Sequence, residues 1–193
     1  MEQTKLTANV RWLIENLGQL PEPVAKPFLV VVSGLPGTGK SYFCHQLTQR
    51  LPAVILESDA LRKALFPSLS YSSAESAHLF RACHQLIESL LKKGIPLIFD
   101  ATNLSELHRE HLYSVAERLD VKLILVRVDA PPELVYQRLK ARGEGLEGNS
   151  DADWGVYQKM KPQVQKIRRN YYALDTSRDI TPVLDKIVRE INK

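Results

Sequence analysis

The stretch of sequence that decides the fold runs from Phe28 to Phe43 and reads FLVVVSGLPGTGKSYF. It opens with a continuous apolar run, which is typical of a parallel strand covered on both faces. Residues 34–41 then match the pattern G-x-x-x-x-G-K-S/T at every fixed position. Apolar residues at helical spacing follow from Lys40 onward. Strand, glycine loop and helix in this order predict a phosphate-binding loop (P-loop).

In such a loop the backbone N–H groups converge on phosphate oxygens, and the following helix N-terminus adds partial positive charge. We expect Lys40 to reach the β- and γ-phosphates of a nucleoside triphosphate and the Ser41 hydroxyl to bind Mg²⁺. The alternative is a glycine-rich turn that binds nothing, and the complete motif in its proper context argues against it. The predicted nucleotide-binding residues are Gly34, Leu35, Pro36, Gly37, Thr38, Gly39, Lys40, Ser41 and Tyr42.

Strands and helices alternate through the rest of the chain, which predicts an α/β fold with about five parallel strands and helices on both faces, a three-layer sandwich. Strands are predicted at residues 28–33, 53–58, 95–100, 121–128 and 172–175. Helices are predicted at residues 7–17, 40–51, 59–66, 105–119, 132–142 and 181–191. A further long helix should begin with a capping box formed by Ser72 and Glu75 and end at Gly94. Residues 1–27 read as an N-terminal helix and proline-rich linker, and residues 28–193 as a P-loop kinase domain with a small helical lid at about 138–160.

The composition sets the broad class of the protein. The chain has 193 residues, of which 44% are hydrophobic and 25% charged, as in one ordinary globular domain. A net charge of +4 is too small to indicate nucleic-acid binding. Cys44 and Cys83 fall in helical patterns and are expected to be buried free thiols. With neither a membrane-spanning run nor a signal peptide in view, a cytoplasmic location is expected.

Asp59 and Arg62 follow the second predicted strand within the segment ESDALRK, residues 57–63. Ligands in open α/β sheets bind at the carboxyl ends of the strands, so both side chains should face the nucleotide cleft. A carboxylate there can take the proton of an attacking hydroxyl, and an arginine one turn further can hold an anionic substrate. The alternative is that Asp59 only caps the helix that it precedes.

Asp100, Thr102 and Asn103 follow the third predicted strand in the segment LIFDATNLS, residues 97–105. The run of apolar residues into Asp100 is typical of a Walker B carboxylate that holds Mg²⁺ or its water ligands. Thr102 and Asn103 could then position a substrate. The alternative is a cluster of polar residues that caps the next helix, and Asp100 reaches the P-loop only if its strand neighbours the P-loop strand.

Arg138 and Arg142 lie four residues apart and therefore on one helix face, directly before the glycine-rich segment 143–151. Arginines on such an element could close over the phosphates and stabilise transition-state charge. The alternative is a pair of ordinary surface arginines.

Three other features fit structural roles better than functional ones. The five histidines lack metal-ligand spacing, and Trp154 suits packing more than base stacking. The basic segment 159–172 suits a solvated helix face.

Together these motifs resemble the P-loop kinases related to polynucleotide 5′-hydroxyl kinase and zeta toxin, which include AAA-type bacterial kinases. The resemblance rests on the P-loop, D-x-x-R after the second strand, D-A-T-N after the third, and R-x-x-x-R with S-D-A-D beyond it, and it covers about Phe28 to Ile191. It implies that Asp59 is the general base, that Arg62 grips an acceptor phosphate, that Asp100 and Asn103 lie in the acceptor site, and that Arg138 and Arg142 touch the donor phosphates. It also places the adenine near the loop at residues 175–179.

The resemblance implies an ATP- and Mg²⁺-dependent phosphotransferase, with Mg²⁺ near Ser41, Asp59 and Asp100. The acceptor would be a hydroxyl of a small molecule or of a nucleic-acid 5′ end. Two alternatives stay open: a nucleoside- or nucleotide-monophosphate kinase, and a nucleotide-binding module without turnover. We expect a monomer or weak homodimer, with an N-terminal helix that either self-associates or packs onto its own domain.

Overall fold

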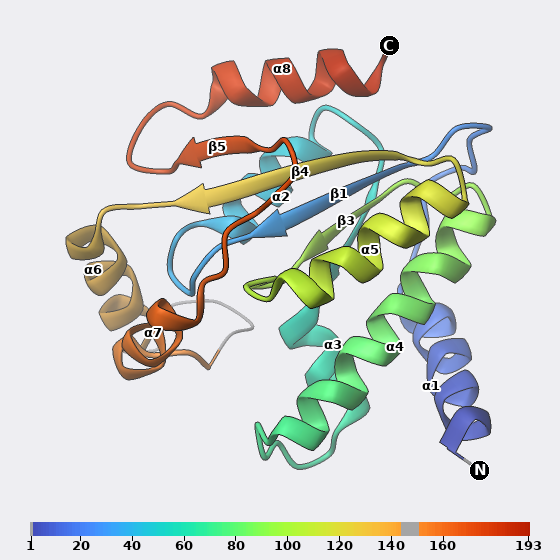
Figure 1. The fold of residues 1–193 in the computed structure, drawn as a ribbon, viewed down its shortest axis with the longest axis horizontal. Helices are drawn as coiled ribbons and strands as arrows, with labels where there is room; N and C mark the ends of the chain where they lie inside the picture. The colour runs from blue at the N-terminus through green and yellow to red at the C-terminus, as the bar shows by residue number, and fades with distance from the viewer. Residues whose placement is uncertain (1, 144–150) are drawn as a thin grey trace.

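The computed structural model describes residues 2–143 and 151–193, and Figure 1 shows their arrangement. The strands of this part are β1 (Phe28–Ser33), β2 (Val54–Glu57), β3 (Leu97–Asp100), β4 (Lys122–Asp129) and β5 (Tyr172–Asp175). Its α-helices are α1 (Glu2–Asn16), α2 (Lys40–Thr48), α3 (Ser58–Leu65), α4 (Ser73–Lys92), α5 (Glu106–Arg118), α6 (Pro132–Gly143), α7 (Trp154–Met160) and α8 (Thr181–Ile191), and the short 3-10 helix η1 covers Lys161–Gln163. The predicted alternation of strands and helices is confirmed.

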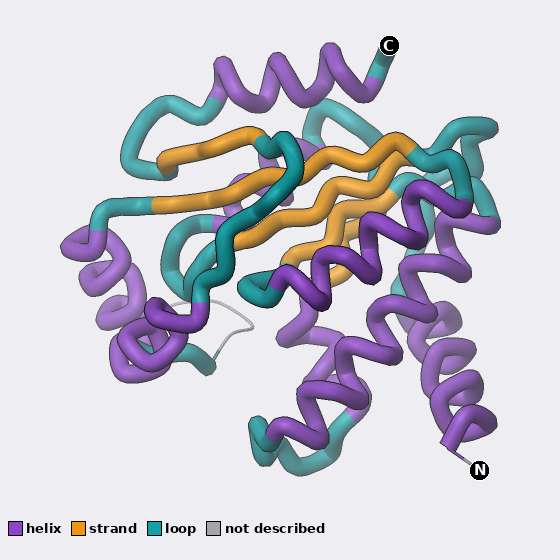
Figure 2. The backbone as a smooth tube through the Cα atoms, viewed as in Figure 1, coloured by secondary structure: helices purple, strands orange, loops and turns teal. Residues whose placement is uncertain are grey.

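The strands form one parallel sheet in the order β2-β3-β1-β4-β5, drawn in orange in Figure 2. β1, which leads into the P-loop, lies between β3 and β4. The register pairs Asp100 with Val32 on one side and with Glu57 on the other. The condition attached to Asp100 is therefore met, because its strand is a direct neighbour of the P-loop strand.

Helices cover both faces of the sheet, and the alternation of side chains along β1 shows how (Figure 1). Leu29 and Val31 pack into a core shared with α1, α4 and α5. Val30 and Val32 pack into a second core shared with α2 and α8. The apolar run is continuous because both faces of β1 are buried, and the predicted three-layer arrangement is confirmed.

The N-terminal helix α1 packs onto its own domain. Val10 and Leu13 are buried in the core beside α4, and the Asn9 amide lies 3.1 Å from the His78 ring nitrogen. Of the two roles expected for this helix, the structure shows this one. The helix spans Glu2–Asn16 and so begins earlier than the predicted residue 7.

The capping box predicted at the start of α4 is only half correct. The Ser72 hydroxyl accepts the Glu75 N–H at 3.2 Å, as expected. The Glu75 carboxylate, however, accepts hydrogen bonds from Arg62 and from the N–H and hydroxyl of Ser70. The pairing with Arg62 draws this carboxylate away from the Ser72 N–H, so the prediction of a reciprocal box was wrong.

α6 and α7 stand beyond the carboxyl ends of the strands (Figure 1). They meet in a small core of Val135, Leu139 and Tyr157, against which Trp154 stacks with a ring-centroid distance of 4.7 Å to Tyr157. Trp154 is therefore a packing residue. Of the loop predicted at 143–151, residues 144–150 lie outside the described residues.

Both cysteines are buried free thiols, as predicted. Within the described ranges, no helix has the length and apolar character needed to cross a membrane.

Candidate active site

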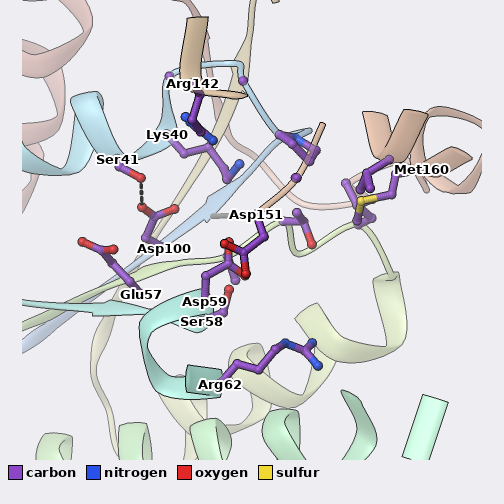
Figure 3. A pocket seen from close by; sticks show the side chains of 18 of the residues that line it. Lys40, Ser41, Glu57, Ser58, Asp59, Arg62, Asp100, Arg142, Asp151 and Met160 are labelled. Carbon is purple, nitrogen blue, oxygen red and sulfur yellow. Dashed lines mark hydrogen bonds between the residues drawn. The ribbon is translucent and has the colours of Figure 1, made fainter. Parts of the chain in front are cut away.

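A cavity of about 1160 Å³ opens at the carboxyl edge of the sheet, and Figure 3 shows its lining. The P-loop and α2 form one wall, α3 and α4 the opposite wall, and α6 and α7 close a side. The sheet produces this arrangement because parallel strands end at one edge, and each strand delivers the loop that follows it there. The predicted site residues that line the cavity are Pro36, Gly37, Gly39, Lys40, Ser41, Tyr42, Asp59, Arg62, Asp100, Thr102, Arg138 and Arg142.

The P-loop requires glycine at Gly39, which joins the loop to α2. Its φ is +93°, in the left-handed region that side-chain-bearing residues rarely adopt. A Cβ there would lie 2.9 Å from Thr176 Cγ2. Thr176 in turn donates a 2.6 Å hydrogen bond to the Thr38 carbonyl. The loop after β5 is thus fitted directly against the P-loop backbone.

Lys40 lies inside the cavity, where its Nζ donates a 3.0 Å hydrogen bond to the Leu35 carbonyl. Burial lowers the pKa of this ammonium, while the carboxylates of Asp100 and Asp59 oppose the shift. A lysine at this position of a P-loop can contact the β- and γ-phosphates of a nucleotide.

Asp100 lies at the end of β3 and accepts a 2.6 Å hydrogen bond from the Ser41 hydroxyl. Only 5% of its surface is exposed. Burial raises the pKa of this carboxyl, and the nearby carboxylates of Glu57 and Asp59 raise it further, whereas Lys40 and Ser41 lower it. A cation placed here would stabilise the ionised form of Asp100.

Glu57 is a site residue that the sequence analysis missed. It ends β2 directly beside Asp100 in the register and lines the cavity, and Figure 3 shows the two carboxylates facing the same region. The available signal was its position at a strand end next to a second strand-end carboxylate.

Asp59 lies in the first turn of α3, which begins at Ser58. The residue that precedes this helix is Glu57, so Asp59 does not occupy the N-cap position that the alternative required. Its carboxylate lines the cavity, and Figure 3 shows it near Asp151. A carboxylate at this place can accept a proton from a hydroxyl bound in the cavity.

Arg62 lines the same wall but is held by its own protein neighbours. It forms an ion pair with Glu75, in which the two side chains are 10% and 5% exposed. Its Nη2 donates to the Ser76 hydroxyl at 3.3 Å, and its guanidinium lies 5.1 Å from the centroid of the Tyr71 ring. The structure thus shows a paired arginine at the position expected to grip an acceptor phosphate.

Arg138 and Arg142 both reach the cavity from α6, and they differ in their contacts. Arg138 donates to the Gly37 carbonyl at 3.3 Å and to the Thr176 hydroxyl at 2.7 Å. It therefore ties α6 to both the P-loop and the loop after β5. Arg142 extends toward Lys40 (Figure 3) and adds positive charge beside that ammonium.

Asn103 is placed differently from the expectation. Its side chain is 1% exposed and donates a 2.7 Å hydrogen bond to the Val32 carbonyl, and it is not among the described residues that line the cavity. Its φ of +44° turns the chain sharply after β3. Asn103 thus supports the end of β1, while Thr102 accepts the Gly34 N–H at 3.1 Å and reaches the cavity.

Arg109 is a buried arginine that sequence reasoning did not single out. It is 1% exposed, pairs with Glu106, and donates to the carbonyls of Asn103, Gln165 and Lys166. It therefore fastens the segment that follows α7 to the turn after β3. No local sequence signal marked it, because α5 carries several other charged residues.

Asp151, which precedes α7, contacts α3 and the segment before α4. Asp151 accepts hydrogen bonds from Lys63 Nζ at 3.0 Å and from the Tyr71 hydroxyl at 2.8 Å. Lys63 and Tyr71 together lower the pKa of Asp151. These contacts join the start of the α7 segment to the wall that carries Arg62.

Three histidines gather between α4 and α5. His84 and His111 stack with ring centroids 5.0 Å apart, and His108 stacks on Phe80 at 4.4 Å. Burial, with the neighbouring rings, lowers the pKa of His84 to about 4 and lowers that of His108. Among the described residues no group of three or more His, Cys, Asp or Glu side chains is arranged to hold a metal ion.

The oxygen atoms near Lys40 suit Mg²⁺ that is bound jointly by side chains and by a nucleotide, rather than by a cage of side chains. Mg²⁺ is usually bound by one or two carboxylates, substrate phosphates and water rather than by a cage of side chains. The Ser41 hydroxyl and the Asp100 carboxylate already meet at 2.6 Å, and Glu57 lies beside them. This set of hard oxygen ligands fits Mg²⁺ that is carried by a nucleotide phosphate.

The fold and the P-loop define a small P-loop protein with a parallel sheet in the order β2-β3-β1-β4-β5. The family model described as an AAA domain matches residues 29–167, which is more than two thirds of the chain. The protein belongs to this family.

Solved structures of kinases share this fold. The APS kinase of Mycobacterium tuberculosis, in complex with AMPPNP and APS, aligns with a TM-score of 0.64 and 22% identity, covering 89% of this chain and 100% of that chain. A gluconokinase from Sinorhizobium meliloti aligns with a TM-score of 0.60 and 19% identity, covering 86% and 89%. A sugar kinase from Janibacter sp. aligns with a TM-score of 0.63 and 15% identity, covering 86% and 95%. At these identities the likeness concerns the fold.

Proposed function

We propose that this protein is an ATP- and Mg²⁺-dependent kinase that transfers the γ-phosphoryl group to a hydroxyl of a small molecule. The observation that carries the proposal is the placement of Asp59 in the same cavity as Lys40 and Ser41, on the wall opposite the P-loop (Figure 3). A site that only binds nucleotide has no need for a carboxylate at that position. A kinase with a hydroxyl acceptor uses one as general base.

The donor half of the cavity would hold the nucleotide. Backbone N–H groups of the P-loop and the N-terminus of α2 would bind the phosphates, with Lys40 and Arg142 placed to balance their charge. Thr176 and Arg178, which line the cavity after β5, would lie on the adenine side. Ser41, Asp100 and Glu57 would hold Mg²⁺, whose positive charge offsets the charge of the β- and γ-phosphates.

The acceptor half would present its hydroxyl between Asp59 and the γ-phosphate. The hydroxyl oxygen forms the new P–O bond, the bond between the γ-phosphorus and the β,γ-bridging oxygen breaks, and ADP leaves. The hydroxyl proton passes to the Asp59 carboxylate. Arg142 and Lys40 would stabilise the negative charge on the phosphoryl group during transfer. Such electrostatic stabilisation is a main source of catalysis in phosphoryl transfer.

The residues that line the cavity on the α7 side would limit the access of water to the bound nucleotide. Val156 and Met160 of α7 line the cavity with apolar atoms, and Asp151 bonds to Lys63 and Tyr71 across it. Excluding water matters because ATP hydrolysis competes with transfer to the acceptor.

Two further observations support a kinase rather than another class of nucleotide-binding protein. The ordered motifs resemble the kinases related to polynucleotide 5′-hydroxyl kinase and zeta toxin, and the named structures that share the fold include an APS kinase, a gluconokinase and a sugar kinase. The cavity adjoins the P-loop and has a volume of about 1160 Å³. Ligand pockets commonly measure about 300–1,000 Å³, so this cavity is large enough for a nucleotide and a small acceptor together.

The test is ADP release from Mg²⁺-ATP across a panel of 5′-hydroxyl oligonucleotides, nucleosides, sugars, amino sugars and UDP-sugars, with Lys40→Ala as the blank. We expect one small-molecule class to stimulate ADP release, and Asp59→Asn to lower that rate by about 10²- to 10⁴-fold. Asp120→Asn, at an exposed turn after α5, is the matched control and should retain the rate.

Each alternative has its own result. A monophosphate acceptor needs no base, so Asp59→Asn with wild-type activity on nucleoside monophosphates would show a monophosphate kinase. ATP binding without ADP release for any acceptor would show a nucleotide-binding module. Stimulation by oligonucleotides alone would contradict the small-molecule acceptor.

A further inference from the structure

The acceptor half of the cavity has a wall formed by Arg62, Tyr71, Ser76, Leu79, Phe80 and His108, which we call the acceptor wall. If the protein is a kinase, as proposed above, this wall selects the acceptor. Its charge and shape therefore bear on which hydroxyl compounds can bind.

The positive charge of Arg62 is already neutralised by an ion pair with a carboxylate of the protein. Glu75 pairs with it at a site where both side chains are almost fully buried. Hydrogen bonds from the hydroxyl and N–H of Ser70, together with Arg62, lower the pKa of Glu75 to about 2, so this carboxylate stays ionised. A phosphate placed at Arg62 would meet the Glu75 charge at short range and would have to displace it from its partner.

The next cation of α3 is also matched. Lys63 Nζ lies 3.0 Å from the Asp151 carboxylate, which also accepts the Tyr71 hydroxyl. Both cations on this side of α3 thus have a protein carboxylate as partner. The other carboxylate nearby, Asp59, adds negative charge toward the acceptor (Figure 3).

The remaining surface of the acceptor wall is apolar and aromatic. Phe80 and His108 stack on each other at 4.4 Å, and Leu79 and Leu104 continue the surface. Burial lowers the pKa of His108, so its ring supplies no positive charge near neutral pH. Such a surface suits a flat face with C–H or ring atoms, and Ser76 and Ser105 offer hydroxyls at its edge.

We propose that the acceptor is an uncharged hydroxyl compound with a ring that presents an apolar face, such as a sugar or nucleoside without phosphate, bound against the acceptor wall. The resemblance noted in the sequence implied the opposite, an arginine free to grip an acceptor phosphate. The Arg62–Glu75 pair is the feature that separates the two expectations.

The test measures binding rather than turnover, so that it does not depend on the kinase reaction. The protein saturated with AMPPNP and Mg²⁺ is titrated in a calorimeter with matched pairs: thymidine and thymidine 3′-monophosphate, glucose and glucose 6-phosphate, N-acetylglucosamine and its UDP derivative. We expect the neutral member of at least one pair to bind about tenfold or more tightly than its phosphorylated partner. Comparing the nucleoside pair with the two sugar pairs shows which of these two classes of hydroxyl compound binds.

Three variants test whether the Arg62–Glu75 pair causes the preference. In Glu75→Gln the charge of Arg62 is released while the side-chain oxygen can still accept from Ser70, so the preference for the neutral member should fall by about tenfold. Lys159 is an exposed cation on the α7 side of the cavity. Lys159→Ala, with Lys161→Ala as a control outside the cavity lining, should leave the preference unchanged.

The proposal is overturned if every phosphorylated member binds as tightly as its partner or more tightly, or if no neutral member binds below about 10 mM. It is also overturned if phosphate binding depends on Lys159. Should Glu75→Gln fail to fold, as judged by circular dichroism, the wild-type affinity ratios decide. A clear neutral preference without ADP release would contradict the proposed function alone, and turnover of phosphorylated acceptors only would contradict this inference alone.

Discussion

The Ser41 hydroxyl donates a 2.6 Å hydrogen bond to Asp100 Oδ2, and this contact links the first turn of α2 to the carboxyl end of β3. It brings a hydroxyl and a buried carboxylate to one point beside Lys40. The two residues lie 59 positions apart in the chain, and only the β1–β3 pairing of the sheet unites them.

Ser41→Ala should weaken the use of Mg²⁺. Because the hydroxyl is a proposed ligand, we expect the Mg²⁺ concentration for half-maximal ADP release to rise about tenfold, and EDTA to abolish turnover of the wild type. Ser114→Ala, on the exposed face of α5, serves as the control. An unchanged Mg²⁺ titration of Ser41→Ala would remove this residue from the metal site.

Gly39→Ala should lower both stability and ATP affinity. The positive φ and the 2.9 Å approach to Thr176 Cγ2 both oppose a side chain, and the strain alone costs about 1–2 kcal/mol. We expect ATP affinity, measured by calorimetry, to fall about tenfold or more. Adding Thr176→Ala removes Cγ2 and Oγ1 but leaves the φ strain, so the double variant should lose less than the sum of the two single losses.

Arg109→Ala should destabilise the fold strongly, because it removes the buried partner of the Glu106 carboxylate and of three backbone carbonyls, of which the Asn103 carbonyl keeps the Ser33 hydroxyl. Removing one member of a buried ion pair costs about 3–5 kcal/mol, measurable by urea unfolding. Amide exchange of residues 164–168 should increase as well. Arg118→Ala, which breaks an exposed pair with Glu88, should cost at most about 1 kcal/mol, and equal losses in the two variants would contradict the role given to Arg109.

His84 should make stability depend on pH. Its pKa falls from 6.5 to about 4 on folding, so below pH 6.5 the unfolded chain binds a proton that the folded chain does not. The free energy of unfolding therefore decreases as the pH falls from 6.5 to about 4. His84→Phe should reduce this decrease by about 3 kcal/mol in urea unfolding, with His84→Leu as a second variant. A decrease of wild-type size in both variants would assign the effect to other groups.

Much of the fold could be predicted because its signals are local. The apolar run into Gly34 and the spacing through Lys40 and Ser41 mark a strand, a loop and a helix within a few residues. Asp59, just after one predicted strand, and Asp100, at the end of another, identify the edge where the cavity lies. Pairings across the chain could not be predicted in this way. Glu75 looks like a capping residue in sequence, yet Arg62, brought beside it by the α3–α4 packing, captures its carboxylate.

Asn103 and Arg109 are polar residues whose structural roles could not be predicted from the sequence. Both are polar types that sequence reasoning tends to assign to a site or to the surface. The structure uses Asn103 to support β1 and Arg109 to fasten the segment after α7. Apart from the Glu106 carboxylate beside Arg109, the partners named here are backbone carbonyls, and a carbonyl has no residue identity that a sequence pattern could reveal.

The Arg138–Thr176 hydrogen bond has a consequence for how this protein can change. The donor side is built from the P-loop, α6 and the loop after β5, whereas five of the six residues of the acceptor wall lie between Arg62 and Phe80. A chimera that exchanges this short stretch with that of a relative would carry a new substrate preference, while the P-loop and Asp100 stayed in place. The order of segments along the chain thus makes the acceptor specificity a separable module for recombination.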